Sequence, residues 1–510
     1  MHALKVTRAE DFPEWYQAVV READLAENSP TRGSMIIKAW GMGFWELIHG
    51  ELDRRIKETG HDNYYFPLLI PLSFFAKEAE HVEGFAKEMA VVTHHRLKQI
   101  DGELKPDPDA ELTEPLIIRP TSETIIGDAF SRWIKSYRDL PLKLNQWANV
   151  MRWEMRTRLF LRTAEFLWQE GHTAHADEAD AMEEAMLALE LYRALAEDFL
   201  AIPVVVGEKP ENERFPGAVR TYSIEAMMQD GKALQAATSH YLGTNFAEAQ
   251  NIRFQDKDGG MSLAHTTSWG MTTRMIGAAV MVHGDDDGMR TPPAAAPKQI
   301  VIVPMLRGKP EDEELKAYCE ALAKELRVGH VFGNAVRAHV DMKDARPADK
   351  RWDWVRRGAP IICEIGPRDA ANGQVTFIKR NALREGEKIK SHTLSRSDFV
   401  AQTAGLLEAA QQELFTEAKA RLEENIRGGF ESFADIEKYY GKGDDEREVK
   451  GWARVSWSRP TGAELDKVGE RLKALKLTIR NAPLKQPASF GKCVFTGNPG
   501  VEEILIARAY

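Results

Sequence analysis

An arginine and a glutamate separated by one residue, Arg152 and Glu154, begin the stretch of this chain that best suits nucleotide chemistry. Arg162 and Phe166 follow in the same stretch, after a short cationic segment at residues 156–158. A guanidinium binds phosphate oxygens through a forked pair of donors, and a carboxylate binds a metal ion or an amine edge. A phenylalanine ring offers a flat surface on which a base stacks. The set therefore indicates a site for a nucleoside triphosphate.

The elements that would hold these side chains form a hairpin. The pattern over residues 147–154 predicts one strand, and the pattern over residues 160–168 predicts a second strand at hairpin spacing. Side chains two residues apart on a strand point the same way, so Arg152 and Glu154 would share one face. An ordinary charged hairpin with an ion pair between its strands fits the same pattern, and the pattern alone does not separate the two interpretations.

Two further segments join a strand to the start of a helix and carry polar groups at the junction. The pattern over residues 114–126 places Thr121 and Glu123 where the predicted helix begins. The pattern over residues 266–277 places Arg274 on the first turns of another helix. A helix N-terminus with an arginine is a binding place for phosphate. For Thr121 and Glu123, simple capping of the helix is the alternative.

Two other polar features are interpreted as structural. His240 stands alone among small polar residues, and a lone histidine more often packs in the core than binds a ligand. The acidic run HGDDDG at residues 283–288 is predicted to be a solvated turn, because adjacent acids in a glycine-flanked loop rarely bind one ion together.

The composition is that of a soluble globular protein with several domains. The chain has 510 residues, of which 43% are hydrophobic and 29% charged, and its net charge is −10. This charge excludes a surface that is basic throughout, but it allows a local basic patch for a polyanion. Cys319, Cys363 and Cys493 lie far apart, which supports neither a disulfide framework nor a four-thiolate zinc site. No targeting segment and no membrane span is recognised, so a cytoplasmic protein is expected.

Three domains are predicted, at residues 1–292, 297–405 and 406–510. The segment at residues 290–297 is rich in proline and alanine and is interpreted as a linker. After it, predicted strands alternate with helices, which indicates a small α/β domain with a mostly parallel sheet. The last part of the chain is a smaller unit that ends in an apolar strand.

Basic residues gather in the second domain around Trp352 and Trp354. A charge run is more often a solvated face, but aromatic rings among cations favour a nucleic-acid surface. The basic residues are Lys350, Arg351, Arg356, Arg357, Arg368, Lys379 and Arg380.

Five strings of the sequence resemble one family, the prolyl-tRNA synthetases, which are class II aminoacyl-tRNA synthetases. They are RPTSET at residues 119–124, MRWEMR at 151–156, FLRTAEFLWQEGHT at 160–173, KALQAATSHYLG at 232–243 and SWGMTTR at 268–274. The resemblance is to the archaeal-and-eukaryotic-like form, which has a C-terminal extension and no editing insert. It implies an α/β and α+β multidomain fold: a class II catalytic core on an antiparallel sheet, an α/β anticodon-binding domain and a small α+β C-terminal domain.

The resemblance implies that the protein activates L-proline with ATP to give prolyl-adenylate, and then transfers proline to tRNA(Pro). Mg²⁺ would accompany ATP. The alternatives are a synthetase-like RNA-binding or regulatory protein without aminoacylation activity, and a relative such as the threonyl enzyme, which needs a pocket zinc. A homodimer is expected, through the predicted helix at residues 36–58 and the strand at residues 63–71, unless both elements belong to the core.

The site residues of the family carry over by position. The catalytic residues would be Arg152, Glu154 and Arg274. The proline-binding residues would be Thr121, Glu123, Arg152, His240, Phe85, Trp168, Glu170, His172 and Phe215. The ATP-binding residues would be Arg152, Glu154, Arg162, Thr163, Phe166, Gln235, Thr238, Thr272 and Arg274, with Gln235 near Mg²⁺. Lys350 and Glu364 are the candidates for reading the anticodon.

Two segments bear on what the protein is expected to lack. Zinc-binding members of this form carry four cysteines in the tail, whereas this tail keeps Cys493 and has Thr496 where another cysteine is expected. A structural zinc is therefore not expected. About 95 residues separate Gly171 from Thr266, too few for a second hydrolytic domain beside the predicted elements, so a separate alanyl-tRNA deacylase is an expected partner. Tyr510 matches the C-terminal tyrosine of the family.

Overall fold

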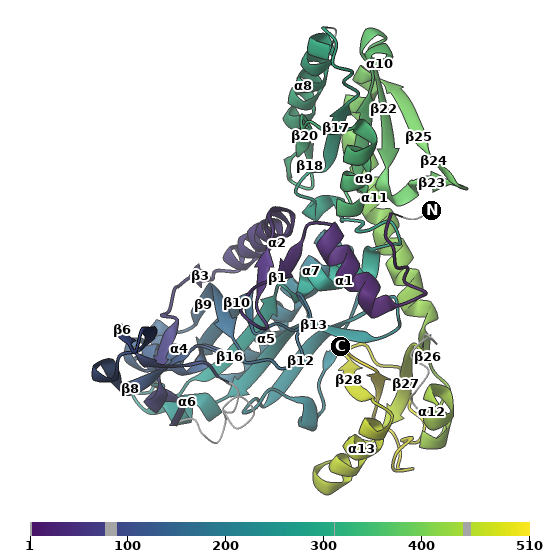
Figure 1. Ribbon diagram of the computed structural model, residues 1–510. Coiled ribbons are helices and arrows are strands. Elements are labelled where there is room, and N and C mark those ends of the chain that lie inside the picture. The colour runs from purple at the N-terminus through teal and green to yellow at the C-terminus, as the bar shows by residue number, and fades with distance from the viewer. Residues whose placement is uncertain (1–2, 77–88, 311, 442–449) are drawn as a thin grey trace.

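The computed structural model of the chain describes residues 3–76, 89–310, 312–441 and 450–510. Figure 1 shows a large central body, an α/β body at the top and a small body at the lower right. Phe85, one of the predicted pocket residues, lies outside the described residues. None of the helices within the described ranges has the length and apolar character needed to cross a bilayer.

A large sheet forms the core of the central body and continues into the small body. Its strand order is β26-β27-β29-β28-β11-β12-β13-β16-β10-β9-β3. The strands from β11 to β9 pair antiparallel, which confirms the predicted antiparallel core. The strands of the central body are β3 (Asp62–Asn63), β9 (Leu142–Met151), β10 (Glu165–His175), β11 (Val204–Glu208), β12 (Arg220–Met227), β13 (Ala233–Gly243) and β16 (His265–Thr272). Those of the small body are β26 (Ile426–Arg427), β27 (Trp452–Trp457), β28 (Thr478–Pro483) and β29 (Glu502–Ala507).

Helices cover one face of the central sheet. They are α2 (Ala39–Glu58), α5 (Glu178–Ala194) and α7 (Arg274–His283). Every residue of α7 after Arg274 is buried, as expected of a helix that is apolar on all sides. It lies among α1 (Phe12–Glu22), α2, α11 (Arg396–Glu424) and the strands β13 and β16. The main hydrophobic core is therefore the layer between the sheet and these helices.

A lobe beyond β9 carries the shorter elements of the central body. Its three-stranded sheet has the order β4-β8-β5. The strands of the lobe and of the N-terminal hairpin are β1 (Ala26–Asn28), β2 (Met35–Ile37), β4 (Leu69–Pro71), β5 (Val91–His94), β6 (Leu97–Ile100), β7 (Glu103–Pro106), β8 (Glu111–Ile118), β14 (Arg253–Gln255) and β15 (Met261–Leu263). The helices are α3 (Leu72–Ala76), α4 (Glu123–Trp133) and α6 (Asn245–Gln250).

The α/β body has a five-stranded sheet of order β20-β17-β21-β22-β25. The pairs β20–β17 and β17–β21 are parallel, whereas β22 and β25 pair antiparallel, so the sheet is mixed rather than mostly parallel. Its strands are β17 (Ile300–Pro304), β20 (Ala338–Val340), β21 (Ile361–Ile365), β22 (Gln374–Lys379) and β25 (Ser391–Ser395), with the short hairpins β18 (His330–Val331), β19 (Asn334–Ala335), β23 (Arg384–Glu385) and β24 (Lys388–Ile389). Its helices are α8 (Asp312–Val328), α9 (Pro347–Arg357) and α10 (Pro367–Ala371).

The long helix α11 connects the α/β body to the small body, which lies below it in Figure 1. The small body adds the helices α12 (Phe433–Tyr440) and α13 (Gly462–Ala474) to its four strands. This mixture of strands and helices agrees with the expected α+β unit.

Several predicted element bounds are wrong. The helix predicted from residue 36 begins at Ala39, because residues 35–37 pair as β2 with β1. The strand predicted over residues 63–71 is two short strands, β3 and β4, which belong to different sheets. The periodicity of apolar residues does not show which distant strand a segment pairs with, so it does not fix where an element begins or ends.

The segment at residues 290–297 connects the central body to the α/β body, but it is not an open linker. Pro293, Ala294 and Ala295 form a buried 3₁₀ turn. The Arg337 guanidinium donates hydrogen bonds to the carbonyls of Pro293, Ala294 and Ala296 at 2.8–3.2 Å. Small residues without polar side chains allow this close approach, so the composition reflects tight packing and not flexibility.

A buried ion cluster fastens the small body to the central sheet. Arg480 on β28 donates to the Glu225 carboxylate on β12 at 2.7 and 3.1 Å, and Lys209 Nζ lies 3.0 Å from the same carboxylate. All three residues are buried. Burial alone would raise the pKa of Glu225, but the charges of Lys209 and Arg480 outweigh it and lower that pKa.

Replacing Arg480 with alanine is expected to lower the thermal unfolding midpoint strongly. The change leaves Glu225 buried with less of its compensating charge, and breaking a buried pair in this way costs about 3–5 kcal/mol. The matched control is Arg454→Ala, which removes an exposed arginine that lies 4.0 Å from the Glu503 carboxylate on the same body and should cost less than about 1 kcal/mol. Differential scanning calorimetry giving equal losses for the two variants would contradict the expectation.

Candidate active site

A cavity of about 490 Å³ opens above the central sheet. Every predicted proline- or ATP-binding residue within the described ranges lines it. These residues are Thr121, Glu123, Arg152, Glu154, Arg162, Thr163, Phe166, Trp168, Glu170, His172, Phe215, Gln235, Thr238, His240, Thr272 and Arg274. The structure thus brings together side chains from segments that are far apart in the sequence.

Strand alternation explains why these side chains face the cavity. Gln169 accepts a hydrogen bond from Tyr192 of α5 at 2.6 Å, so its neighbours on β10, Trp168 and Glu170, point to the other side of the sheet. Next along β10 is Gly171, where an added Cβ would lie 2.1 Å from the indole ring of Trp269. A side chain at Gly171 would therefore push the sheet apart beneath the cavity.

Arg152 and Glu154 do not lie on a shared strand face, which corrects the sequence prediction. β9 ends at Met151 and β10 begins at Glu165, so both residues belong to the loop that joins the two strands. The Arg152 amide still donates to the Ala164 carbonyl at 2.7 Å. The loop is therefore held at its base, and Arg152 is fixed although it follows the strand.

The Arg152 guanidinium is enclosed by backbone and aromatic groups. Its Nε donates to the carbonyl of Pro120 at 2.9 Å. Its central carbon lies 5.7 Å from the ring centroid of Phe166 and 5.5 Å from that of Trp168, within the range of cation–π attraction. The cation thus sits between the aromatic side chains and the chain segment that leads into α4.

Glu154 and Arg162 form an ion pair, so the ordinary charged-hairpin interpretation is realised in part. Arg162 Nε lies 2.6 Å from a Glu154 carboxylate oxygen, and the Arg156 amide donates to the other oxygen at 2.9 Å. Burial alone would raise the pKa of Glu154, but these donors lower it. A ligand with phosphate groups would compete with Glu154 for the exposed Arg162.

Arg274 is the first residue of α7, as predicted, and it lines the same cavity as Arg152. Its amide donates to the Thr272 hydroxyl at 3.0 Å, and its guanidinium donates to the carbonyls of Leu161 and Gln235, both at 3.2 Å. Burial lowers its pKa to about 10, and the charges of Arg152 and Arg162 contribute to the shift. Burial also lowers the pKa of Arg152.

A carboxylate and a histidine are paired at the deep end of the cavity. Glu170 accepts hydrogen bonds from Ser122 Oγ at 2.6 Å and from Gln146 Nε2 at 2.7 Å, and His172 Nε2 lies 2.9 Å from its other oxygen. Burial opposes both charges, but the mutual attraction raises the pKa of His172 and lowers that of Glu170. Thr121 donates a short hydrogen bond to Glu123 nearby.

His240 is a neutral wall of the cavity, not a charged group. Its Nδ1 lies 3.0 Å from Thr221 Oγ1, and that hydroxyl already accepts a hydrogen bond from the Phe215 amide. The hydroxyl proton is therefore free to be donated to Nδ1. Burial, together with the charge of His172, lowers the pKa of His240 to about 3. The Phe215 ring lies 4.7 Å from the imidazole.

Sequence reasoning missed other residues of the cavity wall. Ser268 alternates with Gly270 and Thr272 along β16, and this period of two was a usable signal. Glu213 and Arg214 come from the loop before β12, and no local pattern marks them. Burial raises the pKa of Glu213.

The anticodon candidates lie in the α/β body, away from the cavity. Lys350 on α9 is buried, and its Nζ donates to the Asp341 carbonyl at 3.0 Å. Glu364 on β21 pairs with Arg351 at 3.2 Å. Lys350 is therefore not part of an exposed basic face.

The predicted basic surface is also smaller than its sequence suggests. Arg380 is buried, Arg356 pairs with Asp353, and Arg357 pairs with Asp24. Much of the clustered positive charge therefore serves contacts within the protein.

The tail residues do not fit a tetrahedral zinc site. Cys493 is buried beside the hydroxyls of Ser458 and Thr496, which lie 3.1 Å apart. Burial raises the pKa of the thiol, but hydrogen bonds from these hydroxyls and from backbone amides more than offset it. One thiol and two hydroxyls lack the ligands that zinc takes. Within the described part of the chain, no group of three or more His, Cys, Asp or Glu side chains could hold a metal ion.

Comparison with known proteins gives a consistent result. Residues 105–283 match the family described as tRNA synthetase class II core domain (G, H, P, S and T), and residues 299–403 match the anticodon binding domain family. The chain is 61% identical over its full length to the proline–tRNA ligase of Sphingomonas elodea, covering 99% of that protein. It is 60% identical over its full length to the proline–tRNA ligase of Sphingopyxis alaskensis, covering 96% of it. It is 51% identical over its full length to the proline–tRNA ligase of Bdellovibrio bacteriovorus, covering 99% of that protein.

The paired Glu170 and His172 predict a pH-dependent contribution to stability. The folded pKa of His172 is raised above 6.5, so its stabilising effect is fully present below 6.5 and is lost as the pH rises through the folded value. The difference in unfolding midpoint between the wild type and His172→Gln should therefore shrink with rising pH. His240→Gln is the control of opposite sign, because a pKa lowered to about 3 makes the wild type lose relative stability below 6.5. Parallel pH profiles for the two variants would refute this assignment.

Proposed function

The chain belongs to the proline–tRNA ligase family of class II aminoacyl-tRNA synthetases, and we propose that it joins L-proline to tRNA(Pro) within this cavity. In the first step, a proline carboxylate oxygen forms a bond to the α-phosphorus of ATP as the bond to pyrophosphate breaks. In the second step, a terminal hydroxyl of the tRNA attacks the adenylate carbonyl and AMP leaves. Neither step needs a protein nucleophile, so the protein has to align the reactants and neutralise charge.

The observation that carries this proposal is the placement of Arg152 and Arg274 on one cavity, with the end beside Arg152 lined by Trp168 and Glu123. At that end Glu123 offers a carboxylate to the secondary ammonium of proline. Trp168 and Phe215 offer apolar faces to its ring. Arg152 would contact both the proline carboxylate and the α-phosphate, where negative charge develops in the transition state.

The other end of the cavity suits ATP. Phe166 would stack on the adenine ring, and Arg274 would bind the outer phosphates together with Arg162. Bound Mg²⁺ would supply further neutralisation of the triphosphate, and Glu154 and Gln235 offer the oxygen donors that this ion takes. The hydroxyls that complete this end belong to Thr163, Thr238 and Thr272.

A synthetase-like protein without activity is the second candidate. Such a protein would be expected to lack at least one of the charged side chains that contact the phosphates. Arg152, Glu154 and Arg274 are all present and face the same cavity, which favours the enzyme.

The proposal includes the form of the enzyme and its assembly. The archaeal-and-eukaryotic-like form without an editing insert is supported by residues 178–263, which form elements of the central body between β10 and β16. The homodimer is supported by the exposed apolar side chains of Tyr65, Leu69 and Leu72 beside the three-stranded sheet. A sedimentation mass equal to one chain would count against the dimer.

Arg152→Ala is expected to reduce proline-dependent ATP–pyrophosphate exchange by roughly 10²–10³-fold, because one donor to the developing charge is lost. The protein should remain folded, as judged by circular dichroism. The matched control is Arg132→Ala, which removes an exposed arginine paired with Asp128 on α4 and should exchange normally. Near-normal exchange in folded Arg152→Ala would refute the role of Arg152.

The protein is expected to activate alanine measurably and to leave alanyl-tRNA intact. A pocket for proline admits the smaller alanine, and each missing methylene discriminates by only about 10–200-fold. Residues 178–263 form α5, β11 to β13, α6 and the hairpin β14–β15 of the central body, so no separate hydrolytic domain stands between β10 and β16. Alanyl-tRNA bearing the proline anticodon would be incubated with the purified protein. Deacylation well above the uncatalysed rate would overturn this expectation.

A further inference from the structure

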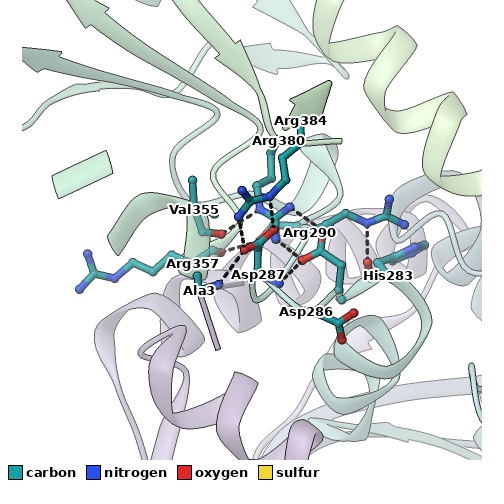
Figure 2. Close-up of polar contacts among 12 residues, drawn as sticks. Ala3, His283, Asp286, Asp287, Arg290, Val355, Arg357, Arg380 and Arg384 are labelled. Atoms are coloured by element: carbon teal, nitrogen blue, oxygen red, sulfur yellow. Dashed lines mark hydrogen bonds and ion pairs between the residues drawn. The ribbon is translucent and has the colours of Figure 1, made fainter. Parts of the chain in front are cut away.

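The acidic loop, defined as residues 285–287, lies between the end of α7 and the segment at residues 290–297 that leads into the α/β body. The sequence suggested a solvated turn, but Asp287 is buried and Asp285 is partly buried. In Figure 2 the loop lies among Arg380 and Arg384, which come from the α/β body, and Arg290, which follows the loop in the sequence. We propose that this loop is a positioning device that couples occupancy of the anticodon-binding body to Arg274 in the active site. The inference rests on the proposed function.

The first contact of the acidic loop is a bidentate ion pair across the boundary between the two bodies. Asp285 accepts from Nη1 and Nη2 of Arg380 at 2.7 and 2.6 Å. The Arg380 side chain is fully buried, and its Nε donates to the carbonyl of Val355 on α9 at 2.8 Å. A planar guanidinium held on both edges fixes direction as well as distance. Movement of α9 or of Arg380 therefore acts directly on Asp285.

A second ion pair lies beside the first (Figure 2). Asp287 accepts from Arg384 of β23 at 2.8 and 3.1 Å and from the Ala3 amide at 2.7 Å. The Asp287 amide donates to the Asp285 carboxylate at 2.9 Å, which links the two acidic residues. The two pairs therefore move as one unit.

Backbone contacts lock the following residues against the end of α9. The Met289 amide donates to the Arg356 carbonyl at 2.9 Å, and the Thr291 amide donates to the Gly358 carbonyl at 3.2 Å. Gly358 has a positive φ of 76°, and a Cβ there would lie 2.4 Å from the Met289 carbonyl oxygen. The two chain segments touch so closely that neither can slide without moving the other.

The acidic loop is equally well tied to the active site through α7. The indole of Trp15 donates to the Asp285 carbonyl at 2.9 Å, just beyond the last turn of the helix. At about 1.5 Å per residue, α7 is a rod of about 15 Å with Arg274 at its other end. At Gly277 an added Cβ would lie 2.6 Å from Leu161, whose carbonyl accepts from Arg274. A helix packed this tightly transmits displacement instead of absorbing it.

α9 links the acidic loop to the residues that would bind the anticodon. Its C-terminal end contacts Met289, just after the acidic loop, and reaches Asp285 through Arg380, while its earlier turns carry Lys350 and Arg351. Arg351 pairs with Glu364, the other anticodon candidate. A base bound near Glu364 would compete for Arg351 and bias the position of α9. The route from that base to Arg274 then consists of two helices and one ion-paired loop.

The experiment compares two neutralised residues of the same loop in the full chain. Asp285→Asn removes the charge that faces Arg380 in the α/β body. Asp286→Asn makes the same chemical change one residue later, where the carboxylate pairs instead with Arg8 near the N-terminus. Each variant is assayed for proline-dependent pyrophosphate exchange without tRNA. Each is then assayed for aminoacylation of tRNA(Pro) and of tRNA(Pro) with a substituted anticodon.

Asp285→Asn is expected to keep its exchange activity while the kcat/KM ratio between native and substituted tRNA falls at least about fivefold, the lower range of typical coupling between sites. Asp286→Asn should keep both its exchange activity and the kcat/KM ratio of the wild type. Arg384→Gln breaks the second ion pair by changing its partner in the α/β body, and it should lower the kcat/KM ratio as well. If Asp285→Asn does not fold, the result for Arg384→Gln tests the proposal.

Three results would overturn the coupling. They are an unchanged ratio in both Asp285→Asn and Arg384→Gln, an equal fall in Asp286→Asn, and a loss of exchange that accompanies the fall in the ratio, which would mark the loop as structural. Failure of the proposed function shows separately, as absence of proline-dependent exchange in the wild type.

Discussion

Two guanidinium groups with like charge share one cavity, and the rest of the site depends on how they are held. Burial lowers the pKa of both Arg152 and Arg274, and the charge of Arg152 contributes to the shift at Arg274. Backbone carbonyls of Pro120, Leu161 and Gln235 accept hydrogen bonds from these cations. An anionic ligand relieves the repulsion, and removal of water strengthens its attraction to both groups. A cavity built in this way favours a molecule that carries phosphate and carboxylate groups together.

Different elements of the central body hold these two cations at the cavity. Arg152 is held by the base of the loop between β9 and β10, and Arg274 is held by a helix that is buried on every side. The same sheet continues into the small body, where Arg480 pairs with Glu225 on β12, a neighbour of the strand that carries Gln235. Tyr510 lies at the far end of this connection, with its ring 5.5 Å from the guanidinium of Arg158 in the loop after Arg152. The central and small bodies are therefore joined next to the active site by specific contacts.

The sequence was most informative where a residue's role is set by its own motif. Residues such as Glu123, Phe166 and Arg274 were assigned by resemblance to a family, and the fold brings them to one cavity: Glu123 and Arg274 begin the helices α4 and α7, and Phe166 lies near the start of β10. The sequence was least informative where a partner lies far along the chain. Asp285 looks like part of a solvated turn because Arg380 is 95 positions away in the numbering. Lys350 looks like an exposed cation because only folding brings the carbonyl of Asp341, which accepts its hydrogen bond, next to its side chain.

The central claim is that Arg152 and Arg274 bind the bound ATP at different phosphates, and a structure of the protein with proline and a non-hydrolysable ATP analogue tests it most directly. We expect the Arg152 guanidinium within hydrogen-bond distance of both the proline carboxylate and the α-phosphate, and the Arg274 guanidinium on the outer phosphates. Phosphates bound away from Arg274, or a proline carboxylate that contacts neither arginine, would contradict the claim.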